Sequence, residues 1–401
     1  IHKMSTLKVG GIRGISASSD AITVANDGTC TANITNNLSN RNLIINGAMQ
    51  VAQRSTSAVA VSDGSNEGYQ TIDRMRFGFG NSAAGACNIS QSTDAPTTLG
   101  FTKSHKVDVT TVNTTATGQQ LINLFYRIEG QDLRNSGWNH LSPSSFLTLS
   151  FYFKTTRTGT SKLPIAFRTR HGTNYYYIQN VTVTDPTNWN RYTVTIPGNS
   201  NLQIDDATTT GMDFFISYYT GPDKDTSSEG SWGSTNAYST SQSTNYFDST
   251  SNDMFITGVQ LEVGSQTTAF EHRSYGEELA LCQRYYYKHA FGSSKAGSSG
   301  ISNDNHPVGM CAIYTSSAGF GYIQYPVTMR ALPTLDNTTG TDYYRIYANG
   351  GTDSFNDISS QQFGVTNSVI NYYDGFSKDT GHAGWIQCYN ANASIAFTAE
   401  L

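Results

Sequence analysis

Short runs of alternating apolar and polar residues, each closed by a turn signal, recur along most of the chain and point to a β-sheet fold. A period of two is the pattern of half-buried strands. Pairs such as Asp185-Pro186 and Pro197-Gly198 mark turns between the runs. Many short strands with polar turns predict an all-β chain built from jelly-roll or β-sandwich domains. The clearest runs lie at 146–153, 163–167, 175–178, 192–196, 212–216, 254–262, 309–314, 321–325, 343–347, 369–373 and 384–389.

The composition fits this class and excludes others. Charged residues make up 14% of the chain, against about 25% in ordinary soluble domains. The polar surface must therefore come from Ser, Thr, Asn and Gly, together with many of the 24 tyrosines. A net charge of −5 argues against a nucleic-acid partner. No apolar run is long enough to span a bilayer, and residues 1–4 lack the apolar core of a signal peptide. We therefore expect no membrane insertion and no export by the general secretory route.

The order of the patterns divides the chain into four parts. Residues 1–40 carry an Asn26-Asp27-Gly28 turn between two strand patterns, which predicts a hairpin appendage. A hairpin of this size cannot bury a core alone, so it needs another chain or a host structure. Residues 41–271 are expected to form the jelly-roll domain, residues 272–291 a linking helix, and residues 292–401 a C-terminal β-sandwich domain. A Gly/Ser linker at 292–300 opens the last part, and a bend or edge is expected at 326–334, between two prolines.

One helix is predicted from a specific capping signal. Ser274 and Glu277 form an S-x-x-E capping box in front of a helical pattern that runs to residue 288. Leu279, Cys282 and Tyr286 fall on one stripe of this helix. The stripe could pack on a domain of the same chain or on symmetry mates at a fibre axis, where it would serve oligomerisation.

Catalytic and metal-binding patterns were sought and not found. The five cysteines, at 30, 87, 282, 311 and 388, are far apart and predict reduced, mostly buried thiols. The eight histidines show no pair at ligand spacing. The acidic pairs Asp205-Asp206 and Glu277-Glu278 are read as solvated or capping residues, and no solenoid repeat of a β-helical tailspike occurs. We therefore predict no catalytic residues, no metal, no cofactor and no enzymatic activity.

Four segments, at 42–54, 69–77, 256–274 and 326–334, resemble tail-fibre and related virion proteins of tailed bacteriophages, particularly marine podoviruses and cyanophages. The family usually has Trp where Met75 stands, so different packing is expected there. The first domain also looks like carbohydrate-binding modules with a jelly-roll fold, because it opens with a strand like 42–47 and closes with one like 259–262. Some of these modules hold a structural calcium near those ends, and here Gln50 occupies the position where an acidic residue is expected.

The resemblance implies a homotrimeric structural fibre subunit of the virion, assembled in the host cytoplasm. It would attach to other virion proteins through its N-terminus and to a host cell-surface glycan or lipopolysaccharide through its outward end. An architectural virion protein without a receptor, such as a head-decorating fibre, collar or tail adaptor, is the alternative. A polysaccharide-degrading tailspike is a third possibility.

Sugar recognition needs aromatic faces together with amide or carboxylate partners. For each single candidate given next, a place in the core is favoured over a contact with a ligand. The candidate ligand-binding residues are Trp232, Tyr238 and Tyr246 in a low-complexity loop at 220–251, and Tyr372, Tyr373, Asp374 and Trp385 near the C-terminus.

Overall fold

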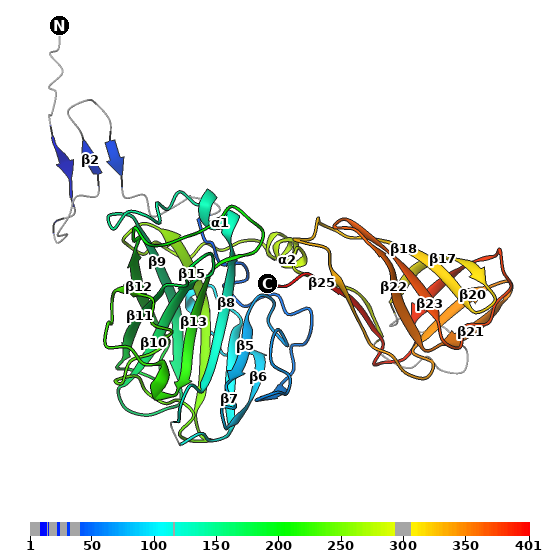
Figure 1. Cartoon of the computed structure of the whole chain (residues 1–401), viewed down its shortest axis with the longest axis horizontal. Coiled ribbons are helices and arrows are strands. Elements are labelled where there is room, and N and C mark those ends of the chain that lie inside the picture. Colours follow the sequence, from blue (N-terminus) through cyan, green and yellow to red (C-terminus); the bar gives the residue numbers. More distant parts are fainter. Residues whose placement is uncertain are drawn as a thin grey trace, which may run out of the picture.

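The computed structural model describes residues 9–13, 15, 22–24, 30–32, 41–114, 117–292 and 306–401. Within these ranges the chain forms antiparallel sheets and two short α-helices, which confirms the all-β prediction (Figure 1). No helix in the described ranges is both long and apolar enough to cross a membrane.

The N-terminal part contains a small three-stranded sheet. Strands β2 and β3 pair antiparallel, as the hairpin signal predicts, and β1 pairs with the other edge of β2. The predicted turn at 26–28 lies outside the described residues. The strand bounds are β1 Gly11–Ile12, β2 Ile22–Val24 and β3 Cys30–Ala32.

The first large domain is a sandwich of two six-stranded antiparallel sheets, here called the front sheet and the back sheet (Figure 1). The front sheet has the order β14 (Trp232–Gly233), β11 (Tyr176–Val183), β10 (Ser161–Thr169), β13 (Thr210–Thr220), β8 (Leu121–Glu129) and β5 (Arg76–Gly80). The back sheet has the order β12 (Asn190–Pro197), β9 (Phe146–Thr155), β15 (Asp253–Val263), β7 (Ser104–Thr111), β6 (Ala86–Ser92) and β4 (Val59–Ser62). The connections carry η1 (Thr97–Leu99), α1 (Gly130–Asn135) and η2 (Pro222–Lys224).

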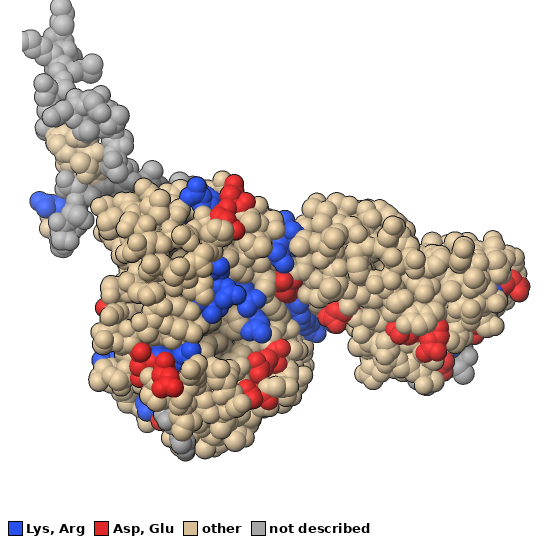
Figure 2. All heavy atoms as spheres, in the orientation of Figure 1, with Lys and Arg blue, Asp and Glu red and all other residues tan. Residues whose placement is uncertain are grey.

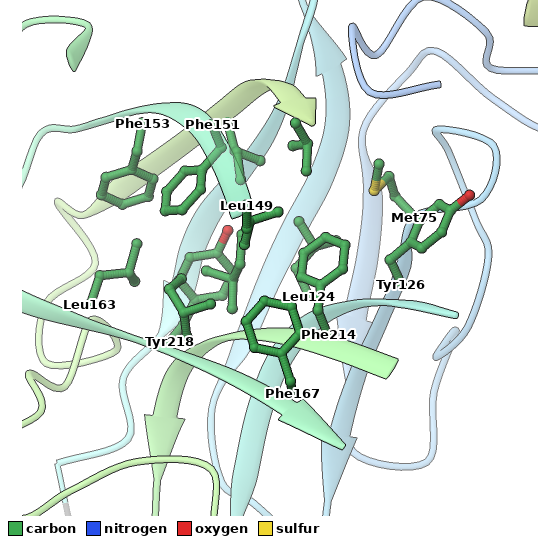
Figure 3. Packing of buried hydrophobic residues seen from close by; sticks show 14 of the residues in the cluster. Met75, Leu124, Tyr126, Leu149, Phe151, Phe153, Leu163, Phe167, Phe214 and Tyr218 are labelled. Atoms are coloured by element: carbon green, nitrogen blue, oxygen red, sulfur yellow. The ribbon is translucent and has the colours of Figure 1, made fainter. Parts of the chain in front are cut away.

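The main core lies between these two sheets. Alternate residues of each strand point inward, because successive side chains of a strand face opposite sides. Thus Phe214 of β13, Phe167 of β10 and Phe151 of β9 meet in one apolar cluster, with Met75 and Tyr126 at its edge (Figure 3). Met75 is almost fully buried. The aromatic content that the composition signals is thus used largely to fill a sandwich.

The second domain combines a seven-stranded sheet with a three-stranded one around its own core. The seven-stranded order is β21 (Gly351–Phe355), β20 (Tyr344–Ala348), β24 (Ala383–Cys388), β17 (Pro307–Thr315), β18 (Ala318–Gln324), β23 (Asn367–Tyr373) and β22 (Asp357–Phe363). The three-stranded order is β16 (Tyr286–Phe291), β25 (Ser394–Thr398) and β19 (Thr334–Asn337). Residues 326–333 form no strand, in line with the bend expected between the prolines. Of the predicted Gly/Ser linker, residues 293–300 lie outside the described ranges.

Helix α2 (Tyr275–Gln283) begins as predicted, with both hydrogen bonds of the capping box between Ser274 and Glu277. It ends five residues before the predicted end. Tyr286 instead opens strand β16, because this segment pairs with the C-terminal strand β25. Cys282 and Tyr286 are buried inside the chain and Leu279 is half-buried. The stripe proposed for oligomerisation is therefore largely occupied by contacts within one chain, which corrects the fibre-axis interpretation for Cys282 and Tyr286.

The segments that carry the phage resemblance hold the two domains together. Arg74, fully buried with a left-handed backbone, lies against the rings of Tyr126 and Tyr285 and pairs with Glu400 from the second domain. From the 326–334 bend, Arg330 donates to the Thr208 carbonyl of the first domain and to carbonyls near the C-terminus. These segments thus have a structural role at the junction of the domains.

Candidate ligand-binding surface

A second apolar cluster lies on the solvent side of the front sheet. Phe215 alternates with core residues along β13, and Phe125 and Ala166 do the same along β8 and β10. Tyr238, from the loop that follows η2, packs edge-on against Phe215 with ring centroids 4.8 Å apart. The sheet is therefore apolar on both faces, and its outer face has an aromatic floor in addition to the buried core beneath it.

Arginine side chains cover this floor. The guanidinium of Arg76 lies 4.6 Å above the centre of the Phe125 ring, and that of Arg127 lies 5.4 Å from it. Arg168 lies over Phe215 at 5.0 Å. Such stacking keeps the cation over the negative face of the ring. The surface offered to solvent is consequently a set of planar cations on an aromatic base.

One carboxylate sits among these arginines. Asp213 of β13 is fully buried and accepts two hydrogen bonds from Arg168, one of them 2.9 Å from Nε. Arg127 and Arg170 approach the same carboxylate at 3.6 and 3.7 Å. Burial, and then the nearby charge of Arg127, lower the pKa of Arg76. Three guanidiniums therefore converge on a single buried anion while a fourth is crowded beside them.

At the β5 edge of this group, Gly78 is buried among neighbouring side chains. A Cβ built at Gly78 would lie in ordinary contact with the Phe125 ring, the Arg76 guanidinium and the Glu67 carboxylate, at 3.5 to 3.7 Å. In the space-filling view, basic side chains gather over the middle of the front sheet beside a hollow, with acidic side chains across from them (Figure 2). We call the group formed by Arg76, Phe125, Arg127, Arg168 and Asp213 on the outer face of the front sheet the basic basin.

The three candidate ligand residues from the 220–251 loop lie in three different environments. Tyr238 belongs to the floor of the basic basin, and its hydroxyl accepts a hydrogen bond of 2.8 Å from Arg168. Trp232 lies at the edge of the front sheet, half-buried against Tyr177, with its Nε1 donating to the Pro197 carbonyl. Tyr246 is fully buried in the main core, so its assignment as a ligand residue is wrong.

The C-terminal candidates lie on the second domain, and only part of them face solvent. Tyr372 is fully buried in that domain's core, which excludes a direct ligand contact. Tyr373 is half-buried and donates to the Asp357 carboxylate at 2.6 Å, and Asp374 is exposed in the turn that follows. Trp385 is half-buried on the outer face of the seven-stranded sheet and stacks in parallel on Tyr347, with centroids 4.2 Å apart.

Trp385 is part of an apolar row across that outer face. Its neighbours across the strands are Tyr347 on one side and Met310 on the other, and Tyr322 pairs with Val369 further along. Met310 and Tyr322 are both more than half exposed. The sequence reasoning found Trp385 but not this row, because the row is assembled from strands distant in sequence.

The acidic pairs and Gln50 have structural contacts. Asp205 lies 3.1 Å from His171, and Glu278 accepts from the backbone N–H of Asn46. Gln50 donates to Thr102 at 3.1 Å, beside a pocket of about 230 Å³. The described residues contain no group of three or more His, Cys, Asp or Glu side chains that could hold a metal ion. Of the cysteines, 87, 282, 311 and 388 are buried free thiols, as predicted, and no side chain is described for the fifth.

The sequence reasoning missed the basic basin, although a signal for it exists. In a chain with few charged residues, Asp213 lies inside the predicted strand 212–216 with apolar neighbours on both sides. A charge at such a position must find a partner on its own face of the sheet. Arg168 directly follows the predicted strand 163–167, and Arg127 lies in β8, which the sequence pattern did not predict, so the order of the strands is needed to bring the three together.

Comparisons with solved structures return distant β-sandwich proteins. The tailspike protein 4 enzymatically active domain of bacteriophage CBA120 matches 56% of this chain at 12% identity with a TM-score of 0.29, and this chain spans only 22% of that one. A family 11 carbohydrate-binding module from Clostridium thermocellum matches 54% of this chain and 99% of its own length, at 11% identity and a TM-score of 0.26. A family 16 module matches 43% of this chain and 84% of its own, at 12% identity and 0.22.

No protein-family model matches the sequence, and no curated protein does. At these identities and TM-scores the comparisons carry no argument about this chain. The roles of individual residues therefore have to be argued from this chain alone.

Proposed function

We propose that this chain is a non-enzymatic, glycan-binding structural subunit of a phage virion fibre, and that it binds host-surface glycan in the basic basin. The observation that carries the proposal is the group of partly exposed arginines around Asp213, which lies over the rings of Phe125 and Phe215 on the face of the front sheet opposite the main core. Saccharides are held by aromatic surfaces that meet their apolar ring faces and by polar groups that orient their hydroxyls. Both kinds of group occur here on one rigid sheet.

The polar groups of the basin also suit a ligand better than a purely structural role. Three arginines approach Asp213, one more than approach Glu400 at the junction of the domains. Burying unmatched charge is costly unless another partner completes the set. The surplus donors therefore support a bound polar molecule.

The placement in a virion rests on the resemblance of four segments to tail-fibre proteins. Under this proposal the N-terminal sheet joins other virion proteins, the chain forms a homotrimer, and three weak sites gain avidity together. An architectural subunit without a receptor is the competing function. The apolar outer row around Met310 and Trp385 favours it, because exposed apolar rows on a sheet are suited to protein contacts.

Binding of the purified protein to host cells and to a glycan array tests the proposal. We expect binding that is weakened by Arg170→Gln, which removes a partly exposed guanidinium beside Asp213, and that is retained by Tyr322→Ala on the second domain. Absence of binding to cells and to every glycan would contradict the receptor role and favour the architectural one. New reducing ends after incubation with host polysaccharide would instead identify a tailspike enzyme.

A further inference from the structure

The outer face of the seven-stranded sheet in the second domain is an exposed apolar surface. Met310 and Tyr314 of β17 and Tyr322 of β18 are 62%, 67% and 57% exposed. Together they present roughly 350 Å² to solvent, since a large aromatic side chain offers about 150–250 Å². Single exposed apolar residues need no explanation, but a contiguous patch of several hundred Å² marks a contact with another molecule.

The strand register joins most of these side chains into one row. The row crosses the central strands of the sheet and is apolar throughout, and across β20, β24, β17, β18 and β23 it consists of Tyr347, Trp385, Met310, Tyr322 and Val369. Thr352 of β21 and Gln362 of β22 continue it at the two edges of the sheet. An apolar centre with a polar rim is the arrangement found in protein–protein interfaces.

The lack of charge on this face indicates what covers it. Neither this row nor its neighbour, both within the described range 306–401, contains a charged side chain, and the neighbouring row consists of Ala383, Ala312, Phe320 and Asn371. The outward charges of the sheet, Arg345 and Asp357, lie outside both rows, against the Tyr389 ring at 3.5 Å and the Tyr373 hydroxyl respectively. The whole chain carries a net charge of −5, so its copies repel one another through charged surfaces but not through this face.

The orientation of the rings favours a sheet rather than a sugar as the partner. Trp385 and Tyr347 stack on each other with an interplanar angle of 6° and centroids 4.2 Å apart. A saccharide needs an open ring face, whereas these two rings cover each other. Side chains that stand up from a sheet side by side are suited to interdigitate with those of an opposing sheet.

The size of the face is also sufficient. The seven strands span about 29 Å and a seven-residue strand about 23 Å, so the face covers roughly 650 Å². Each partner buries about 800 Å² in a standard protein–protein interface. The sheet of one copy therefore supplies most of the area that a stable contact requires.

We infer that the outer face of this sheet packs against the same face of other copies of this chain. The contact replaces the stripe of α2, whose residues Cys282 and Tyr286 are buried within one chain. The inference rests on the proposed function for the number of copies, because the homotrimer belongs to that proposal. It applies equally to a receptor-binding and to an architectural subunit.

Light scattering of the purified full chain tests the inference. We expect the mass of three chains for the wild-type protein and of one chain for Met310→Lys, because the contact would bury an unpaired charge. Met310→Glu should act in the same way although it changes the net charge in the opposite direction. Leu332→Lys introduces the same charge at a side chain that is 65% exposed in the 326–334 bend, so this matched control should stay trimeric. Tyr322→Ala adds no charge and leaves the other rings in place, so it should also stay trimeric.

Circular dichroism checks that each variant is folded, and Ala312→Lys, the next outward position on β17, repeats the test if Met310→Lys does not fold. A trimer that persists in the folded lysine and glutamate variants would overturn this face while leaving the homotrimer in place. Dissociation of Leu332→Lys as well would overturn it too, since the effect would then not depend on the face. A monomeric wild-type protein would overturn the contact together with the homotrimer, whereas glycan binding is decided by its own assay.

Discussion

Two buried titratable side chains in the first domain should give the stability of this protein opposite responses to pH. Asp73 is fully buried and accepts hydrogen bonds from Gln53, and burial raises its pKa to about 6. His105 is almost fully buried beside Phe77, neither ring nitrogen has a hydrogen-bond partner, and burial lowers its pKa to about 4. Each group therefore titrates at different pH in the folded and unfolded chains.

The signs follow from which state binds the proton more tightly. The folded pKa of Asp73 is raised above its unfolded value of about 3.8, so its favourable contribution is complete at low pH and is lost as pH rises through about 6. The folded pKa of His105 is depressed below about 6.5, so its contribution is complete at high pH and is lost as pH falls toward 4. Over the same window the two contributions oppose each other.

Their magnitudes can be worked from these pKa values. Lowering the pH from 7 to 5 should raise the free energy of unfolding by about 1.3 kcal/mol through Asp73, because the folded aspartate gains a proton that the unfolded one does not. The same change should lower the free energy of unfolding by about 1.8 kcal/mol through His105, because the unfolded histidine gains a proton that the folded one does not bind. The two contributions nearly cancel, so replacing either residue should reveal the pH dependence that the other gives to the stability.

Urea unfolding at pH 5 and pH 7, followed by tryptophan fluorescence, measures this. Between pH 7 and pH 5, the free energy of unfolding of His105→Leu should rise by about 2 kcal/mol relative to that of the wild-type protein. Over the same pH change, the free energy of unfolding of Asp73→Asn should fall by about 1 kcal/mol relative to that of the wild-type protein. His382→Leu, exposed in the second domain, is the control for first-domain unfolding. If the difference between His105→Leu and the wild-type protein is the same at both pH values, the buried, neutral state assigned to His105 is wrong.

Three further substitutions test structural contacts by denaturant unfolding. Gly47→Ala should destabilise the first domain by about 2 kcal/mol or more, because its Cβ would lie 2.1 Å from the Val259 carbonyl oxygen; a neutral result would show that this approach is relaxed in solution. Glu400→Gln leaves buried Arg74 without its counter-charge and should cost about 3 kcal/mol, whereas a loss below 1 kcal/mol would mean that the pair contributes little to docking. Ser274→Ala removes the helix cap and should cost about 1 kcal/mol, with Ser274→Thr as the conservative control.

Strand positions and the helix start could be predicted because they depend on local pattern. The alternation in residues 212–216 became the centre of β13, and Ser274 caps α2 through contacts within four residues. The end of the helix could not be predicted in the same way. Tyr286 follows a good helical pattern, and only the distant strand β25, which pairs with it, makes it part of a sheet. Local propensity gave way there to a tertiary contact.

The ligand candidates illustrate a second limit. Tyr238 and Tyr246 are eight positions apart in one low-complexity loop, and nothing local separates them. The structure places Tyr238 beneath Arg168 on the outer face and Tyr246 between the two sheets. When both faces of a sheet carry aromatic residues, a period of two shows that the faces differ without showing which one meets solvent. Burial then depends on where the long loop folds, which the sequence pattern does not determine.

Charge offers the better guide in a chain that has so little of it. At the junction of the domains, Arg74 pairs with Glu400, and Arg284 forms two hydrogen bonds with Glu129. Arg54 shares Glu400 with Arg74, so arginines outnumber the carboxylate there as well. On the front sheet three arginines approach Asp213. The two groups differ in exposure, because Arg54 and Arg74 keep 13% and 1% of their side chains exposed whereas Arg170 and Arg127 keep 36% and 22%, and that contrast is the reason to look for a ligand in the basic basin rather than at the junction.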